Sequence, residues 1–537
     1  MAAQQRAFII VPALILGGAL AGGLLGSSGQ SRSSPAPGGS SDEEVNASLS
    51  QFSKVYDLVE DNSADRVTPD NGIYKGAIPG MLRTLDPHSN FLDSKQFAGL
   101  GEEQKGRYFG VGMEIGAQPK TGRTMVVAPF GGSPAYKAGL RPGDIIVAVN
   151  DKRVENLTTT EVADLLKGPR GTKVQIVVQR EGVDKPITFN VVRDEVKRYS
   201  IDAAFWVKPS IAYIDLTQFT ETTSEELDAD LKKLGEQNIH GLILDLRGDP
   251  GGLLPEAVAV GGRWLQRGQV VVSHKGRAFS EKPYMAHGSQ YGLNYPIVVL
   301  VDRYTASAAE IVSGALQDHD RGWILGDTTF GKGLVQSEFP LSNNTGLLLT
   351  TQHYYTPSGR LIQRDYSKMS FLDYYYGRHT GNKDSADVKQ TDLGRVVYGG
   401  GGITPDEHYD APKSNVFEIA VLRKNAFFSF TAQYFGGKEA KLPKGWAPSE
   451  EVMNNFHDYL MKQGVQFTEA DWTANHEWLR NRLQQEMYIT AFSLDQSKEL
   501  QVSEDPEVQK AIEALPKAAD LLARMKSHSE VIRASRK

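Results

Sequence analysis

The sequence predicts a multidomain α/β protein with a helical N-terminal cap, a β-rich domain with helices, an α/β core with a largely parallel sheet, and a helical C-terminal extension. The chain has 537 residues, which is too long for one hydrophobic core, because domains usually hold roughly 100–200 residues. Strand-like and helix-like apolar patterns alternate within residues 195–410, and helical periodicity dominates residues 411–537. We therefore expect several compact units.

The composition is that of an ordinary globular protein, with 40% hydrophobic and 23% charged residues. A formal net charge of −6 offers no basic field for phosphate backbones, so nucleic acid is not expected as a partner. The chain has no cysteine, which excludes a disulfide framework, a thiol nucleophile and a cysteine metal site.

Residues 1–26 are expected to be a signal-anchor or a signal peptide. Residues 7–26 form an uncharged apolar run of about the length that spans a bilayer as a helix. The small-x-small sequence at residues 19–21 offers a cleavage site, so removal of the segment is the alternative. Arg6 precedes the run and should stay inside, so both alternatives export the bulk of the chain. Residues 27–42 form a Ser/Gly/Pro linker.

Residues 43–106 are predicted to form a small helical region. Its first helix carries an apolar stripe at helical spacing, made by Leu49, Phe52, Val55, Tyr56 and Val59. The stripe is expected to pack either on the protein itself or on a second copy of it. A second helix is expected to end before Asp86-Pro87.

Residues 107–194 resemble a PDZ domain. The stretch YFGVGMEI has the character of a loop whose backbone amides hold a terminal carboxylate, and residues 131–151 resemble the stretch that precedes the central strands of that family. Such a domain adds an extended peptide to a sheet edge and captures its C-terminal carboxylate. The expected peptide-binding residues are Tyr108, Phe109, Gly110, Val111 and Gly112.

The α/β core is predicted from buried strands that are each followed by a turn. HGLILDLRGD (240–249), PIVVLVD (296–302) and WILGD (323–327) have the pattern of buried strands, and LLPEAVAVGGRWLQ and SAAEIVSGALQDHD have the pattern of helices. This alternation is typical of a largely parallel sheet, in which reactive groups collect where strands end and helices begin.

Two such turns contain candidate functional residues. GDTTFGKG (326–333) nearly matches a phosphate-binding loop, but Gly333 replaces the required hydroxyl residue and the residues after it lack the pattern of a helix. RYTASAAE (303–310) places Ser307 at the start of a helix, where a serine is usually an N-cap. A serine nucleophile needs a base, and a lysine can serve if burial lowers its pKa towards working pH. Lys332, in an apolar glycine turn, is such a candidate.

These stretches resemble the carboxy-terminal processing (tail-specific) serine proteases, a family that uses a serine–lysine dyad with an assisting glutamine. Lys332 follows Ser307 by 25 residues and Gln336 follows Lys332 by four, which is the spacing of that family. The resemblance also covers LDPHS (85–89), DLRGDPGG (245–252) and GGGITPD (400–406). It implies that Ser307 is the nucleophile, Lys332 the general base and Gln336 the residue that orients the lysine.

The same resemblance implies that DLRGDPGG is an oxyanion loop, with one backbone donor at Gly252 and a second at Ala308. No G-x-S-x-G or HExxH motif occurs, and His319 lies too far along the helix of Ser307 to be its base. The reaction would be acyl transfer without cofactor or metal.

The resemblance further implies substrates with a free nonpolar C-terminus, which the PDZ domain would bind. Gating of the protease core of residues 195–410 by that domain is a further expectation. Location in the bacterial cell envelope is expected, with anchoring in the inner membrane or secretion after signal cleavage, and a homo-oligomer or adaptor protein as a further partner. A non-catalytic PDZ scaffold of the same fold is the alternative function. In residues 411–537 the sequence indicates helices, with Asp505 and Pro506 at cap and first-turn positions, and no recognisable chemistry.

Overall fold

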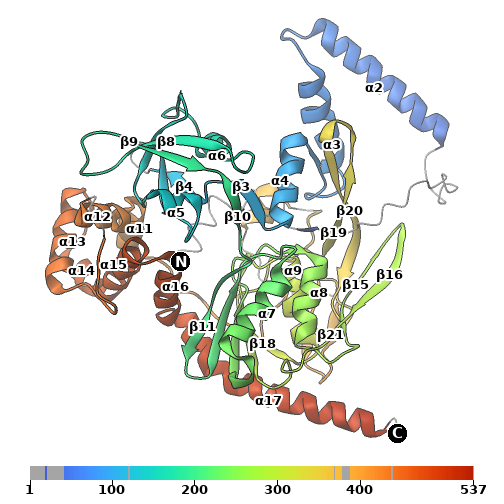
Figure 1. Ribbon diagram of the computed structural model, residues 1–537. Helices are drawn as coiled ribbons and strands as arrows, with labels where there is room; N and C mark the ends of the chain where they lie inside the picture. The colour runs from blue at the N-terminus through green and yellow to red at the C-terminus, as the bar shows by residue number, and fades with distance from the viewer. Residues whose placement is uncertain are drawn as a thin grey trace.

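The computed structural model describes residues 19–20, 41–118, 121–367, 369–377, 387–436 and 440–535. Within these ranges the order of units is the predicted one, from a helical N-terminal region to a helical C-terminal end (Figure 1). Across the part of the chain that the structure describes, no helix has both the length and the hydropathy needed to cross a membrane. The predicted anchor or signal peptide lies outside these residues except for Ala19–Leu20, which are extended and not helical.

The N-terminal region consists of the elements α2 (Asp42–Asn62), the π-helical turn η1 (Asp70–Ala77), α3 (Ile78–Arg83), β2 (Asn90–Leu92) and α4 (Ser94–Gln104). α2 extends away from the body of the chain (Figure 1), and none of its residues is buried. Leu49 and Phe52 are 58% and 43% exposed. The predicted helix is therefore confirmed. Tyr56 packs on the protein itself, since a Cβ at Gly72 would lie 2.9 Å from its ring, whereas the other four residues of the stripe are exposed. Packing of these four on a second copy stays a prediction.

The PDZ segment forms a sheet of antiparallel pairs in the order β4-β5-β6-β8-β9, with β7 on β6. Its elements are β3 (Arg107–Gly110), β4 (Met113–Ala117), β5 (Thr124–Pro129), α5 (Pro134–Ala138), β6 (Ile145–Val149), β7 (Lys152–Arg153), α6 (Thr159–Leu166), β8 (Lys173–Gln179), β9 (Ile187–Val192) and β10 (Asp194–Lys197). β3 pairs with β10, which fastens the two ends of the domain together. β4 is left as an edge strand, where a peptide could be added.

The core sheet has the order β11-β12-β13-β17-β18-β23, and every pair except β11·β12 is parallel. Its strands are β11 (Ile201–Lys208), β12 (Ile211–Leu216), β13 (Gly241–Asp245), β17 (Ile297–Val301), β18 (Gly322–Gly326) and β23 (Glu407–His408). The three buried strands predicted from the sequence are thus neighbours in one sheet. Their carboxyl ends meet at the same edge, which brings the turns after them together.

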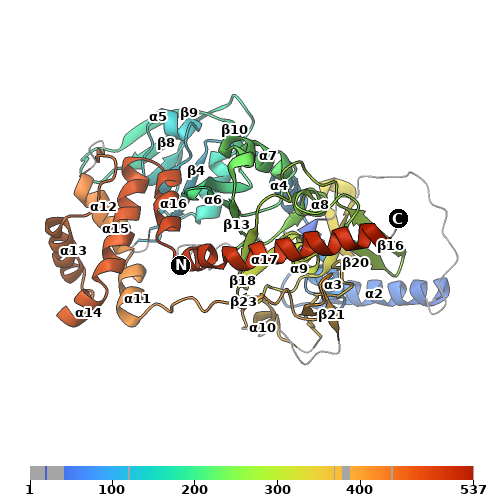
Figure 2. The same cartoon turned by 90° about the horizontal axis from the view of Figure 1, so that it is seen from below.

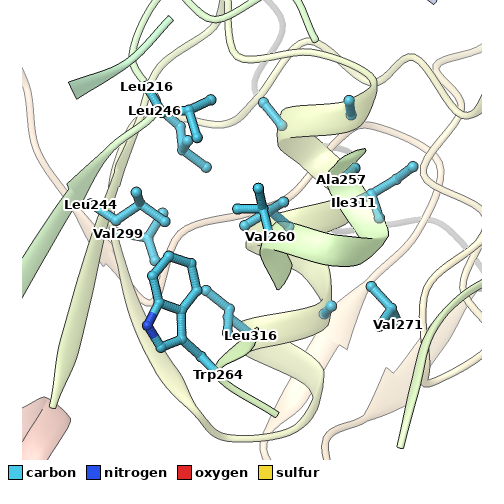
Figure 3. Packing of buried hydrophobic residues seen from close by; sticks show 14 of the residues in the cluster. Leu216, Leu244, Leu246, Ala257, Val260, Trp264, Val271, Val299, Ile311 and Leu316 are labelled. Carbon is cyan, nitrogen blue, oxygen red and sulfur yellow. The ribbon is translucent and has the colours of Figure 1, made fainter. Parts of the chain in front are cut away.

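Helices cover both faces of this sheet. α7 (Thr223–Leu234), α8 (Leu254–Arg263) and α9 (Ala308–Asp318) share one apolar core with the sheet, in which Trp264 lies beside Val299 and Leu316 (Figure 3). The opposite face is covered by the last helix, α17 (Pro506–Ser535), through Val508, Ala511 and Leu515. Figure 2 shows α17 running across the core.

A second sheet has the order β14-β1-β19-β20-β15-β16, with β2 on β20. Its strands are β1 (Ala19–Leu20), β14 (Gly252–Leu253), β15 (Val270–Gly276), β16 (Phe279–Met285), β19 (Leu334–Pro340) and β20 (Gly346–Tyr355). The chain after Gly333 is therefore a strand and not a helix, as expected from the sequence. Shorter elements complete the core: η2 (Glu236–Asn238), η3 (Ser342–Asn344), α10 (Phe371–Tyr376), β21 (Val388–Gln390) and β22 (Val396–Tyr398).

The C-terminal extension is helical, as predicted. Its helices are α11 (Val416–Arg423), α12 (Ala426–Phe435), α13 (Glu450–Lys462), α14 (Glu469–Ala474), α15 (His476–Ala491), α16 (Leu494–Ser503) and α17. α11 to α15 have an apolar core of their own. α12 contacts the PDZ segment, since a Cβ at Gly143 would lie 3.7 Å from the ring of Phe428. The extension thus reaches both the PDZ segment and the core sheet.

Candidate active site

Ser307 lies in the sharp turn between β17 and α9. Its backbone has φ 53° and ψ −113°, a conformation that a residue with a side chain rarely adopts. Such strain at a strand-to-helix turn is typical of nucleophile positions. Ser307 is only 5% exposed, and the helix that it starts is buried along its whole length.

Lys332 lies in the turn between β18 and β19 and is 1% exposed. Burial disfavours its charged form and lowers its pKa to about 7, although the carboxylates of Asp86 and Glu310 act in the opposite direction. A neutral amine is therefore available near neutral pH. The adjacent Gly331 has φ +85°, and a Cβ there would lie 2.9 Å from Gly402 N, so the turn is tightly enclosed.

Gln336 lies on β19 and is fully buried. Lys332 Nζ donates a hydrogen bond to Gln336 Oε1 at 3.3 Å, and Gln336 Nε2 donates to the carbonyl oxygen of His88 at 2.7 Å. The His88 ring contacts the Tyr374 hydroxyl at 2.9 Å, and burial keeps the pKa of His88 well below its usual value. The LDPHS loop therefore fixes the glutamine, which in turn holds the lysine.

Glu310 is a functional residue that the sequence interpretation missed. Its Oε2 accepts hydrogen bonds from the backbone amides of Ser307 at 2.9 Å and Lys332 at 2.8 Å. Its Oε1 accepts from Gly331 N at 2.7 Å and from the hydroxyl of Thr329. One buried carboxylate thus ties the serine turn to the lysine turn. The Ser-x-x-Glu spacing from Ser307 to Glu310, a capping-box pattern, was the signal that could have identified it.

The Glu310 carboxylate binds the backbone amides of both Ser307 and Lys332. No hydrogen bond joins the side chains of these two residues in the described part of the chain. Within the described residues, the hydrogen bond of Lys332 Nζ is with Gln336. A proton could pass from Ser307 to Lys332 only after the two side chains come into hydrogen-bond contact. Catalytic hydrogen bonds are often long or absent without substrate and tighten when it binds.

Residues 246–252, here called the glycine loop, are fastened to the serine turn. Gly248 N donates to Asp302 Oδ1 at 3.0 Å, and Ala306 N donates to the carbonyl oxygen of Asp249 at 2.9 Å. The Thr305 hydroxyl donates to the carbonyl oxygen of Leu246 at 2.8 Å. These three contacts fix the position of the glycine loop relative to the turn that carries Ser307.

The two consecutive glycines of this loop lie where no side chain fits. A Cβ at Gly251 would lie 2.7 Å from Ala308 N, and one at Gly252 would lie 2.0 Å from Phe219 O. Gly252 has φ +147°. The loop thus approaches Ala308, whose amide belongs to the first turn of α9. This arrangement brings the two predicted donors, Gly252 and Ala308, to the same end of the sheet as Ser307.

An extended segment fits between β14 and β19. Ala19 pairs with Gly252 in parallel register, and Leu20 pairs with both Leu253 and Gln336. The chain's own residues therefore occupy a strand position that borders two of the predicted site residues.

The predicted carboxylate-binding loop lies at the start of β4. The Gly112 carbonyl oxygen accepts from the Ser133 hydroxyl at 2.6 Å, and Ala135 N donates to the carbonyl oxygen of Val111 at 2.8 Å. Gly110 and Val111 are buried, whereas Phe109 is 40% exposed. Tyr108 and Phe109 belong to β3, outside the PDZ sheet, and Lys167 Nζ lies 5.1 Å from the Tyr108 ring centroid. Of the five predicted residues, the loop that adjoins the edge strand therefore contains Val111 and Gly112, and Gly110 is the last residue of β3.

His319 lies at the far end of α9, where its ring contacts the carbonyl oxygen of Val270 and the carboxylate of Asp392, both at 2.7 Å. It cannot act on Ser307, in agreement with the sequence interpretation. Among the residues that the structure describes, no group of three or more His, Cys, Asp or Glu side chains is placed to hold a metal ion.

Comparisons with known families identify both central units. Residues 210–367 match the model of peptidase family S41, and residues 126–180 match that of the PDZ domain. The serine turn, the lysine turn and the glycine loop all lie inside the first match.

Curated relatives match over more than half of the chain. The carboxy-terminal-processing protease of Bartonella bacilliformis is 38% identical over 322 residues, which cover 59% of this chain and 72% of the relative. The carboxy-terminal processing protease CtpA of Bacillus subtilis is 33% identical over 339 residues, covering 60% and 72%. Among solved structures, the photosystem II D1 C-terminal processing protease is 29% identical, covers 67% of this chain and 87% of its own, and has a TM-score of 0.35.

Proposed function

Because the chain belongs to peptidase family S41, the family of the carboxy-terminal processing proteases, and is a serine-type peptidase with a PDZ domain, we propose that it cleaves exported proteins with a Ser307–Lys332 dyad. In this proposal the substrates are recognised by their nonpolar C-termini. The observation that carries the proposal is the Glu310 carboxylate, which holds the backbones of Ser307 and of a buried lysine with a pKa of about 7.

The proposed reaction is acyl transfer. Neutral Lys332 takes the Ser307 proton, and the Ser307 oxygen attacks the scissile carbonyl carbon. The amides of Gly252 and Ala308 hold the oxyanion, a contribution of roughly 3–4 kcal/mol for each donor. Lys332 then gives its proton to the leaving amine, and water hydrolyses the acyl-enzyme. Gln336, fixed by the His88 carbonyl oxygen, keeps the lysine aimed at the serine.

Substrate binding is proposed to use two extended-peptide sites. The PDZ domain, assigned to residues 107–194, binds the free carboxylate at the loop around Gly110 to Gly112 and adds the tail to β4. The scissile segment would lie between β14 and β19, and the pairing of Ala19–Leu20 with both strands supports this position. Peptide binding to the PDZ domain could also draw Ser307 and Lys332 into hydrogen-bond contact, which would gate the core of residues 195–410.

We place the protein in the cell envelope, since residues 7–26 have the composition of an anchor or signal peptide. The exposed stripe of α2 supports assembly with a second copy.

The proposal is tested by comparing a peptide that ends in a free apolar C-terminus with its amidated twin, using protein that lacks residues 1–42. The free-ended peptide should be cleaved faster, and Ser307→Ala and Lys332→Ala should each abolish cleavage of both peptides while the fold is kept. Undiminished cleavage by either variant would refute the dyad. Equal cleavage of the two peptides would refute tail recognition. Binding without cleavage by the unaltered protein, with or without a non-cleaved C-terminal peptide in trans, would restore the scaffold alternative.

A further inference from the structure

Arg247 connects the glycine loop to the C-terminal extension. It lies five residues before Gly252, and its guanidinium contacts three carboxylates. Arg247 Nη2 lies 2.6 Å from Asp245 Oδ2 and 3.0 Å from Asp505 Oδ2, and Arg247 Nη1 donates to Glu507 Oε2 at 2.8 Å. Asp245 belongs to β13, but the other two carboxylates come from the start of α17, about half the chain length away.

The carboxylates of α17 are held in place by their own helix and by the sheet. Asp505 caps α17, because its Oδ1 accepts a hydrogen bond from Glu507 N at 2.8 Å. Glu507 is 8% exposed, and a Cβ at Gly326 would lie 3.2 Å from Glu507 Oε1, so the side chain is enclosed by β18. Burial raises the pKa of Glu507 to about 7 despite the neighbouring arginine. Desolvation of this kind is costly, and a charged partner at hydrogen-bond distance offsets it.

Contacts of the neighbouring strand β12 support the ion pairs of Arg247. Tyr213 of β12 donates its hydroxyl to Asp245 Oδ2 at 2.7 Å. Lys498 of α16 lies 2.6 Å from Asp215 Oδ2, also on β12. Two successive helices of the extension are thus ion-paired to the carboxyl ends of two neighbouring strands. The side chain of Arg247 therefore has a fixed position relative to the core sheet.

The glycine loop is fastened in three ways. Its Gly252 end pairs with Phe219, since Phe219 N donates to the carbonyl oxygen of Gly251 and Leu253 N donates to that of Phe219, both at 2.9 Å. Its backbone is tied to the serine turn through Asp302, Thr305 and Ala306. Its arginine, Arg247, is tied to β13 and to the start of α17. A donor at Gly252 has to keep hydrogen-bond distance to the developing oxyanion to stabilise it, so a loop that loses one of these fastenings would lose part of this effect.

We propose that Asp505 and Glu507 are positioning residues of the active site. Their ion pairs with Arg247 hold the glycine loop in its position beside Ser307. The C-terminal extension is then part of the catalytic apparatus and not only a cover over the sheet. This inference rests on the proposed assignment of the glycine loop as the oxyanion loop.

The test uses Asp505→Asn combined with Glu507→Gln in the chain that lacks residues 1–42. Each substitution keeps the shape of the side chain and one acceptor oxygen, but replaces the other oxygen by an amide NH2 group and removes the charge that holds Arg247. We expect kcat to fall at least about tenfold, because a displaced donor loses part of the roughly 100-fold effect of a complete oxyanion donor. KM should change less than about twofold, since the PDZ contacts are untouched. The affinity for a peptide aldehyde, whose adduct with Ser307 places an oxygen between the two amides, should fall in parallel with kcat.

Lys517→Gln is the matched control. It removes an ion pair of α17 with Glu407 at 2.7 Å, on the same helix but away from Arg247, and it should leave kcat and aldehyde affinity unchanged. All rates are compared below the melting temperature of each variant, and Glu507→Gln alone replaces the double variant if that does not fold. An unchanged kcat in the charge-removed variant, or an equal loss in Lys517→Gln, would overturn the inference. Residual cleavage by Ser307→Ala in the same assay would instead overturn the proposed function.

Discussion

The buried position of Lys332 predicts how cleavage depends on pH. With a pKa of about 7, roughly three quarters of the enzyme carries the neutral lysine at pH 7.5, compared with about one molecule in a thousand for a lysine of ordinary pKa. Burial therefore accounts for an increase of almost three orders of magnitude in the fraction of competent enzyme. We expect kcat/KM to rise with pH along a single ionisation with its midpoint near 7 and to level off above about pH 8.

A substitution at Asp86 tests the origin of this midpoint. The Asp86 carboxylate favours the charged lysine, so Asp86→Asn should move the midpoint to lower pH while the plateau is kept within a few-fold. The measurement is kcat/KM between pH 5.5 and 9.5 at constant ionic strength. His88→Asn, which keeps the carbonyl oxygen that holds Gln336, should leave the midpoint near 7, because the pKa of His88 is well below its usual value. A midpoint above 9 in the unaltered enzyme, or a shift to higher pH in Asp86→Asn, would refute the assignment of Lys332 as the base.

Three further predictions concern the positioning of the site and the surface of α2. Gln336→Ala leaves the buried His88 carbonyl oxygen without its donor. It should lower the free energy of unfolding, measured in urea, by about 1–3 kcal/mol, and it should also lower kcat. Unchanged stability would show that the carbonyl oxygen finds another partner. Gly252→Ala should reduce kcat at least about 100-fold, since a Cβ would lie 2.0 Å from Phe219 O, and cleavage at the unaltered rate would exclude Gly252 as a close-approach position. In analytical ultracentrifugation, protein lacking residues 1–40 should sediment as an oligomer, and replacing both Leu49 and Phe52 by glutamate should shift it to the monomer mass, because charge on the exposed stripe opposes self-association. A monomer in both forms would argue against a second copy on α2.

The parts of the fold that the sequence predicted are those governed by local patterns. The buried strands around Leu244, Val299 and Leu325 consist of consecutive apolar residues, and each is followed by a turn rich in glycine or by a helix start. The same locality made Ser307 and Lys332 detectable, since both lie directly after strands that are neighbours in the sheet. Glu310 was within reach of the same reasoning, because its spacing from Ser307 is a known capping pattern.

Contacts between distant segments were not predictable in this way. Gln336 donates to the carbonyl oxygen of a residue 248 positions earlier. Every residue has a backbone carbonyl group, so the residue type at that position does not indicate the contact. Likewise, the apolar stripe of α2 was compatible with two partners, and its period does not specify which one is present. In the structure, Tyr56 packs beside Gly72, whereas the rest of the stripe is exposed and its partner stays a prediction.

Asp505 illustrates why a residue can be predicted correctly and still be understood only in part. The Asp-Pro pair indicated a helix start, and the side chain does cap α17. The other oxygen of the same carboxylate lies 3.0 Å from Arg247 Nη2, a contact between segments too distant in the sequence for a local pattern to indicate it. A capping aspartate has one oxygen to spare after it accepts from its own helix, so a cap that abuts a reactive loop can hold that loop at no further conformational cost. In the proposed arrangement, the cap of α17 therefore acts on the glycine loop through Arg247, although α17 is far from that loop in the sequence.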